Sequence, residues 1–191
     1  MKQLRLFLES LFPISNEEFE YIANLFIAEN YKAKEVIVQT GQIAKSIYLI
    51  EKGLLRTYHL MDGKEINTYF ACDGQFISTF ASFIQQTPSI ETLEAIEDTM
   101  VYSLSKEALE AAYLKYPKFE KLGRYMAEQN YLCVTERTLV MQTKTGREKY
   151  LHFLENNTLK IVQRVPQHYI ASFLGMAPES LSRIRKEIVR S

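Results

Sequence analysis

The spacing of two prolines, one alanine and one glycine near the C-terminus constrains the fold of this chain most strongly. Pro166 and Pro178 each stand where a helix can begin, because a first turn tolerates the missing N–H of proline. Ala171 supplies the small residue that two crossing helices need where they touch, and Gly175 tolerates the positive φ of a tight turn. Four apolar residues have the spacing that seals such a joint: Ile170, Leu174, Leu181 and Ile184. The pattern predicts a helix-turn-helix over residues 166–188.

The second of these helices is predicted to carry its polar residues on the outer face. Arginine can bond a guanine with two hydrogen bonds, glutamate can accept from a cytosine amine, and serine is adaptable. The residues expected to read bases are Glu179, Ser182 and Arg183. Those expected to contact phosphates are Gln167, Ser180 and Lys186. The alternative is an ordinary pair of packed helices with a charged surface.

The charge of the chain is unevenly distributed. The formal net charge is +0, but residues 144–191 hold nine basic and four acidic residues, a net charge of +5, so the rest carries −5. A basic end on an acidic body indicates binding to a polyanion such as DNA, although a solvated charged face gives the same count.

The middle of the chain is predicted to form an antiparallel β barrel or sandwich. Four glycines follow one another at intervals of 12, 10 and 11 residues, a regular spacing of turns: Gly41, Gly53, Gly63 and Gly74. Asp62–Gly63 between strand-like runs predicts a hairpin. Strands are expected near residues 35–39, 46–50, 54–60, 90–96 and 99–104. Residues 1–30 are expected to be helical, with Ser15 or Asn16 as a helix N-cap.

A long helix is expected over about residues 117–142. It carries a seam with helical spacing: Phe119, Leu122, Met126, Gln129, Cys133, Glu136 and Val140. The seam could pack on the chain's own barrel or form a two-helix dimer interface with polar register positions; our interpretation is a homodimer. The chain then divides into an effector barrel with the long helix at 1–142 and a DNA-binding domain at 143–191. A β-wing is either absent or lies between Thr158 and Val165, where residues 159–162 look strand-like.

Composition excludes several classes of protein. Two cysteines, Cys72 and Cys133, cannot build a disulfide framework or a four-thiolate metal site. Because no signal peptide or bilayer-spanning apolar run is visible, we expect a cytoplasmic protein without membrane contact. No phosphate-binding loop or hydrolase motif is present, so we expect no enzyme, no catalytic residue, no metal and no cofactor.

The predicted order of elements, an α+β arrangement of N-terminal helices, a jelly-roll-like antiparallel barrel, a long helix and a helix-turn-helix, resembles the CRP/FNR superfamily of transcription regulators. The segments 41–56, Gly74–Ile77 and Glu179–Arg183 carry the likeness, which covers roughly residues 10–190. The resemblance implies a homodimer on an inverted repeat of double-stranded DNA with a TGA-type half-site, RNA polymerase as a further partner, and an unidentified small-molecule effector. The rival hypothesis is a ligand-binding or protein-interaction module that does not bind DNA.

The expected effector pocket departs from the cyclic-nucleotide pattern of that family. Its residues are Gly74, Gln75, Phe76, Ser89 and Ile90. Gln75 stands where the family has a glutamate for the ribose, and segment 85–92 has no arginine for the phosphate. An anionic phosphate is costly to bury without a cation, so we expect no cAMP binding. The first 71 residues lack the cysteines that an iron–sulfur cluster needs. Haem would have to use His59 or Cys72, and a lone histidine is usually structural.

Overall fold

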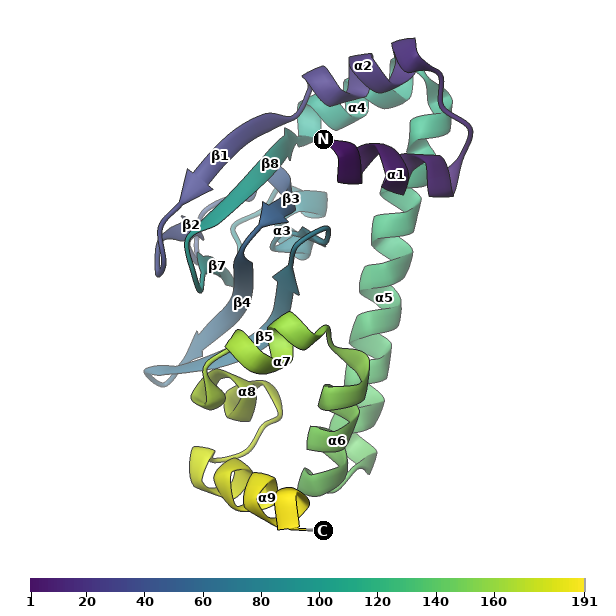
Figure 1. Ribbon diagram of the computed structural model, residues 1–191. Coiled ribbons are helices and arrows are strands. Elements are labelled where there is room, and N and C mark those ends of the chain that lie inside the picture. The colour runs from purple at the N-terminus through teal and green to yellow at the C-terminus, as the bar shows by residue number, and fades with distance from the viewer. Residues whose placement is uncertain (191) are drawn as a thin grey trace.

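Two four-stranded antiparallel sheets form the middle of the chain in a computed structural model that describes residues 1–190 (Figure 1). One sheet has the strand order β1-β8-β3-β6 and the other has the order β2-β7-β4-β5. The strands are β1 Ile27–Tyr31, β2 Val36–Val38, β3 Ser46–Lys52, β4 Leu54–Met61, β5 Lys64–Cys72, β6 Phe76–Ile77, β7 Thr92–Ala95 and β8 Thr99–Ser105. The predicted mixed fold with an antiparallel barrel is confirmed.

The predicted hairpin joins β4 to β5. Met61 pairs with Lys64, and the two residues between them, Asp62 and Gly63, have φ values of +50° and +74°. Two positive φ values are the condition for the two-residue turn whose twist matches that of the flanking strands. The C-terminal helices pack against β5 of this hairpin.

The N-terminal helices are shorter than the sequence suggested. Helix α1 spans Lys2–Leu11 and α2 spans Asn16–Asn24, where the Ser15 side chain accepts from the Glu18 N–H in a capping box. The expectation of helix up to residue 30 is wrong at its end, because β1 begins at Ile27 and pairs with β8 along its whole length. The hydrogen bonds that stabilise β1 come from β8, which is distant in sequence, so the local periodicity could not predict this strand.

Two shorter helices flank the strands that follow. Helix α3 spans Phe80–Gln85, and α4 spans Lys106–Lys115. The Ser105 side chain caps α4 by accepting from the Ala108 N–H.

The long helix α5 spans Glu120–Thr143 and follows a short 3₁₀ turn at Pro117–Phe119. Its 24 residues reach about 36 Å, so the helix runs along the side of the barrel to the C-terminal end of the molecule (Figure 1). Phe119, Leu122 and Met126 of the predicted seam lie in the main core with the residues of α1, α2 and the first sheet. The seam thus follows the first of the two alternatives, packing on the chain's own body.

Four helices complete the chain: α6 Gly146–Asn156, α7 Leu159–Arg164, α8 Gln167–Phe173 and α9 Pro178–Arg190. The strand-like interpretation of residues 159–162 is wrong, because these residues lie in α7. The Thr158 side chain caps α7 by accepting from the Ile161 N–H, and Ile161 itself is buried. Capping and burial of one face outweigh the strand propensity of Ile161 and Val162.

A second apolar cluster joins these helices to the barrel. Leu54, Phe70 and Cys72 of β4 and β5 pack with the buried side chains of α6, α7, α8 and α9. The expected domain boundary near residue 142 is therefore bridged by shared packing. Among the described helices, none combines the length and the apolar character needed to cross a bilayer.

Candidate nucleic-acid interface

The turn between α8 and α9 has the geometry that the proline and glycine positions predicted. Gly175 has a φ of +65°, and a Cβ at this position would lie 2.5 Å from Met141 Cε of α5. Ala171 is fully buried, and its carbonyl accepts from the Met176 N–H at 3.0 Å. The crossing of the two helices thus depends on a residue that tolerates a left-handed backbone and on a small residue at the contact.

The outer face of α9 is an exposed polar surface. Its exposed members share one shallow concavity with Pro178: Glu179, Ser182, Arg183 and Lys186. Leu181 is buried on the opposite face, so the helix is anchored through its apolar side. No described residue forms a salt bridge with Arg183 or Lys186. These charged groups face solvent, which is the condition for contact with an external polyanion.

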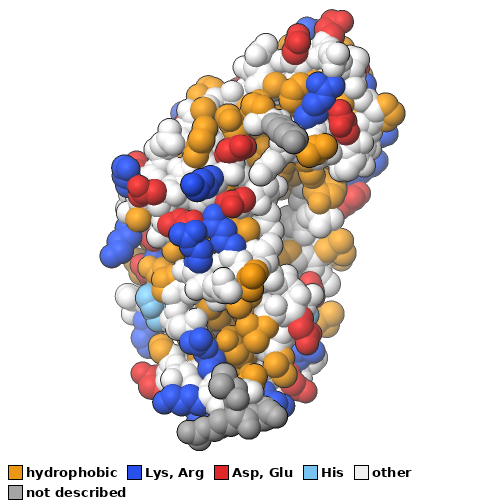
Figure 2. All heavy atoms as spheres, in the orientation of Figure 1, with side chains coloured by type: hydrophobic (Ala, Val, Ile, Leu, Met, Phe, Trp, Pro, Cys, Tyr) orange, Lys and Arg blue, Asp and Glu red, His pale blue; other side chains and the backbone are white. Residues whose placement is uncertain are grey.

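The two basic side chains of α7 are already engaged in ion pairs. Lys160 Nζ lies 2.6 Å from Asp73 Oδ1 and 3.2 Å from Glu97 Oε1, and Arg164 Nη2 lies 2.7 Å from Glu97 Oε2. These ion pairs attach α7 to the barrel. Part of the positive charge counted in the sequence is therefore structural, on α7, whereas Arg183 and Lys186 of α9 face solvent. Figure 2 shows blue side chains at the end of the molecule that the C-terminal helices form.

The two remaining residues of the predicted interface lie at the beginnings of their helices. Ser180 is half-buried in the first turn of α9, and Gln167 is half-buried as the first residue of α8. Gln167 Oε1 is a buried oxygen without a hydrogen-bond partner. Both residues are placed where backbone N–H groups point outward, which suits a phosphate, but their contact with DNA stays a prediction.

Helix α8 is docked on the β4–β5 hairpin. The Ser172 hydroxyl donates to the Glu65 carbonyl at 2.6 Å and accepts from the Asn67 N–H at 3.0 Å. The Phe70 and Phe173 rings pack with centroids 5.3 Å apart. The first helix of the helix-turn-helix is therefore held by hydrogen bonds and by apolar contact.

A buried arginine that the sequence analysis did not single out links the same two elements. Arg56 on β4 is 1% exposed; its Nη2 donates to Glu94 Oε1 at 2.9 Å, and its Nη1 lies 2.7 Å from Glu65 Oε2. Its guanidinium carbon lies 3.7 Å from the ring centre of Tyr169 on α8. Burial alone would lower the pKa of Arg56, but the hydrogen bond to Glu65 and the charge of Glu94 raise it above the usual value. No local pattern marks Arg56, because its partners come from three different segments.

The barrel and α5 enclose a cavity of about 430 Å³. Gly74, Gln75 and Phe76 line it, as expected for the effector pocket, but Ser89 and Ile90 do not. The Ser89 side chain is used within its own loop, where it donates to the Glu91 carbonyl, and Ile90 is exposed. Three of the five predicted pocket residues are thus brought together.

The charged residues that line this cavity are Glu91 and Arg137. The Glu91 carboxylate accepts from the Thr68 hydroxyl at 2.6 Å, and that hydroxyl lies 2.7 Å from Thr57 Oγ1. Arg137, from α5, donates to the carbonyls of Thr68 and Asn67 at 3.2 and 3.1 Å. The sequence analysis missed both residues. Glu91 lies in a loop without a motif, and the position of Arg137 in α5 matches no pattern.

The two side chains considered for haem lie at opposite ends of one hairpin. Cys72 pairs with Leu54, and His59 pairs with Ile66. Cys72 is buried, with its sulfur 3.1 Å from Thr158 Oγ1, whereas His59 Nδ1 lies 2.9 Å from the Ile90 carbonyl. The structure does not bring the two together.

The outward face of α5 carries large apolar residues that no described element covers. They are Tyr131, Leu132 and Leu139, each more than half exposed. Val134 is also more than half exposed, but it lines the barrel cavity. Orange side chains appear along this edge of the molecule in Figure 2. Of the seam predicted for dimerisation, Gln129 and Cys133 instead line the cavity against the barrel.

A family model matches the middle of the chain. Residues 28–116 match the family model of the cyclic nucleotide-binding domain. A search of curated protein sequences gave no match.

Solved structures share the whole arrangement. FixK2 from Bradyrhizobium japonicum has 20% sequence identity and a TM-score of 0.77, covering 86% of this chain and 85% of its own. A CooA mutant from Carboxydothermus hydrogenoformans has 16% identity and a TM-score of 0.71, covering 88% of this chain and 78% of its own. A protein from Eubacterium rectale described as a transcriptional regulator of the Crp/Fnr family has 21% identity and a TM-score of 0.69, covering 95% and 88%. At these identities the likeness shows a common fold.

Proposed function

We propose that this chain, which contains a cyclic nucleotide-binding domain and has the fold of CRP/FNR-type regulators, is a sequence-specific DNA-binding transcription regulator that acts as a homodimer. The observation that carries the proposal is the exposed set of Glu179, Ser182, Arg183 and Lys186 on α9, whose charged members have no partner among the described residues. Four polar side chains on one helix face, anchored through a buried opposite face, suit insertion into a major groove.

In this proposal the polar residues of the helix-turn-helix have two roles. Arg183 bonds a guanine, Glu179 accepts from a cytosine amine or a neighbouring base, and Ser182 meets a thymine or adenine edge. Gln167, Ser180 and Lys186 contact phosphates and set the register of α9 on the duplex. The half-site is of the TGA type, as the resemblance to the family implies.

The outward face of α5 is the proposed dimer interface. Leu132 and Leu139 lie seven residues apart on this face, a separation of two helical turns, and both are more than half exposed. A second copy of the helix would cover them. Two copies related by a twofold axis present two recognition helices to half-sites about one turn of DNA apart, which explains an inverted repeat. RNA polymerase is a further proposed partner of the DNA-bound dimer.

The barrel cavity is proposed to hold an effector other than cAMP. Segment 85–92 brings the Glu91 carboxylate to this cavity instead of an arginine, and this carboxylate would repel a phosphate. The cation that lines the cavity, Arg137, comes from α5 and donates to two backbone carbonyls of β5. Gln75 Oε1 accepts from the Cys72 N–H, so the side-chain carbonyl of Gln75 already has a hydrogen-bond partner in the cavity wall. Titration calorimetry with cAMP is expected to give no saturable heat; a micromolar affinity would contradict this part of the proposal.

Selection from random double-stranded DNA tests the proposed function. The full chain should enrich an inverted repeat whose two half-sites are centred about one helical turn apart. The rival function, a ligand-binding or protein-interaction module, predicts that no sequence is enriched above the input pool. Enrichment of an asymmetric single site would keep DNA binding but reject the homodimer.

A further inference from the structure

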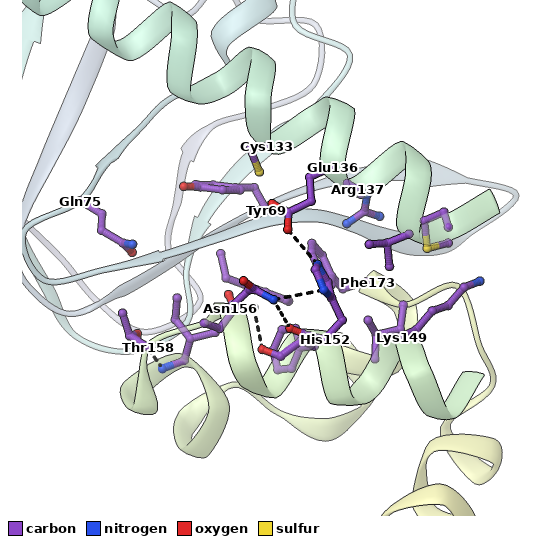
Figure 3. A pocket seen from close by; sticks show the side chains of 17 residues that line it. Tyr69, Gln75, Cys133, Glu136, Arg137, Lys149, His152, Asn156, Thr158 and Phe173 are labelled. Carbon is purple, nitrogen blue, oxygen red and sulfur yellow. Dashed lines mark hydrogen bonds and ion pairs between the residues drawn. The ribbon is translucent and has the colours of Figure 1, made fainter. Parts of the chain in front are cut away.

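A second cavity lies between the barrel, α5 and the C-terminal helices. It measures about 200 Å³, and its walls come from β5, α5, α6, α7 and α8 (Figure 3). Tyr69, Gln75, Cys133 and Arg137 separate it from the barrel cavity, because they line both. It is therefore an interdomain cavity, with walls from the barrel, from α5 and from the C-terminal helices.

The positive charge of Arg137 is not balanced by a carboxylate within ion-pair distance in the described part of the chain. Its Nη1 and Nη2 donate to two backbone carbonyls of β5, and its guanidinium carbon lies 4.1 Å from the ring centre of Phe173. Burial lowers the pKa of the Arg137 guanidinium, the expected effect of desolvating a cation. Carbonyl oxygens carry only partial charge, so an anion would stabilise this group further.

The acidic residue at this cavity is already engaged. Glu136 is 55% exposed at the rim, and His152 Nε2 lies 3.0 Å from its Oε1. The Asn156 side-chain amide, 3.1 Å from His152 Nδ1, contacts the other ring nitrogen. Figure 3 shows this chain of three side chains across the cavity, with Arg137 and Phe173 beside it. Glu136 therefore belongs to the solvated rim, whereas Arg137 is the charge of the interior.

Apart from Lys149 and a polar edge formed by Gln75, Asn157 and Thr158, most of the remaining wall is apolar. Its apolar members include Val140 of α5, Phe153 of α6, Ile161 of α7 and Phe173 of α8. Apolar cavities of about 150 Å³ can hold one benzene ring. A cavity of about 200 Å³ therefore has room for one ring or a short branched chain, together with a carboxylate.

We propose that the interdomain cavity binds a small organic carboxylate with a compact apolar body, its charge on Arg137 and its body against Val140, Phe153 and Phe173. The occupant would touch α5 and the helix-turn-helix at once and would hold them together. Only the effect of the ligand on DNA affinity rests on the proposed function; binding itself does not.

Benzoate tests the site, and benzamide is its matched uncharged control. Calorimetric titration of the full chain should give saturable binding of benzoate and at least about tenfold weaker binding of benzamide, because a charge-assisted hydrogen bond contributes more than a neutral one. Intermolecular NOEs should join the benzoate ring protons to the Val140 methyl groups. If benzoate does not bind at millimolar concentration, or if benzamide binds equally well, the proposal is wrong.

Three variants locate the ligand. Val140→Phe fills the interdomain cavity and should abolish binding, whereas Ala81→Phe fills only the barrel cavity and should leave it unchanged. Arg137→Gln should bring the affinity for benzoate down to that for benzamide. The reverse pattern, with loss in Ala81→Phe and none in Val140→Phe, would place the ligand in the barrel and reject the interdomain site. Benzoate binding by a chain that selects no DNA would reject the proposed function alone.

Discussion

At the scale of single residues, the polar side chains of α9 divide by what they can recognise. Arg183 can make two hydrogen bonds to one guanine, whereas Lys186 is a point charge that suits a phosphate. Both are exposed and share one concavity, so neither is needed to hold the helix in place. Substitutions at the two positions should therefore affect DNA binding without changing stability.

Arg183→Ala should cost about 1–3 kcal/mol of binding free energy on the best site and relax the preference at one base pair in each half-site. The measurement is selection from random DNA, followed by affinity on single-base variants of the selected site. An unchanged consensus would show that Arg183 does not read bases.

Lys186→Ala is the matched control for that experiment. Loss of a phosphate contact weakens binding to every sequence alike and reduces the slope of log affinity against log salt by about one unit. A changed consensus in this variant would contradict its assignment to a phosphate.

At the scale of elements, α5 has two faces that both carry apolar residues. Leu122 and Met126 are buried against the body of the chain, whereas Leu132 and Leu139 are exposed on the other face. The double variant Leu132→Glu with Leu139→Glu should give folded monomers, because it places charges only where a partner helix would bury them. Light scattering gives the mass, and circular dichroism shows that the helices remain.

The inner face of α5 is the control for this prediction. Leu122→Glu with Met126→Glu should unfold the chain instead of giving monomers, because both side chains lie in the main core. A wild-type chain that is already monomeric at micromolar concentration would reject the dimer.

The difference between the two faces also shows what the sequence could and could not predict at this scale. Periodicity found α5 and the seam, but residues three and four apart repeat on every face of a helix, so the pattern could not tell which face meets a partner. The turns were predictable because Gly63 and Gly175 adopt positive φ, a local property. Residues 159–162 were misassigned because the side chain of Thr158 caps a helix there.

Some residues of the candidate site could likewise be predicted from the sequence, and others could not. The exposed residues of α9 were predictable, since one amphipathic helix determines which of its residues face outward. Arg56, Glu91 and Arg137 were not, because each acquires its role from strands and helices distant in sequence. For a buried charge, the sequence shows which residue carries it but not which groups lie around it in the fold.

At the scale of the whole molecule, Arg56 joins the barrel to the helix-turn-helix. Arg56→Met should lower the free energy of unfolding by about 3 kcal/mol, because it leaves the buried Glu94 carboxylate without its cation. Urea denaturation measures the loss. Adding Glu94→Met should recover part of it, since an apolar pair replaces the buried ion pair. If the double variant is no more stable than the single one, the unpaired carboxylate is not the cause.

The hydrogen bonds of Ser172 to Glu65 and Asn67 join residues 107 and 105 positions apart in the chain. A ribosome adding about 5–20 residues per second completes β5 roughly 5–20 seconds before α8. During that interval the nascent hairpin exposes Phe70, which α8 later covers. Synthesis therefore adds the proposed DNA-reading helices last, onto a surface that only a finished barrel presents. A chain with a misfolded barrel would leave α8 and α9 without support.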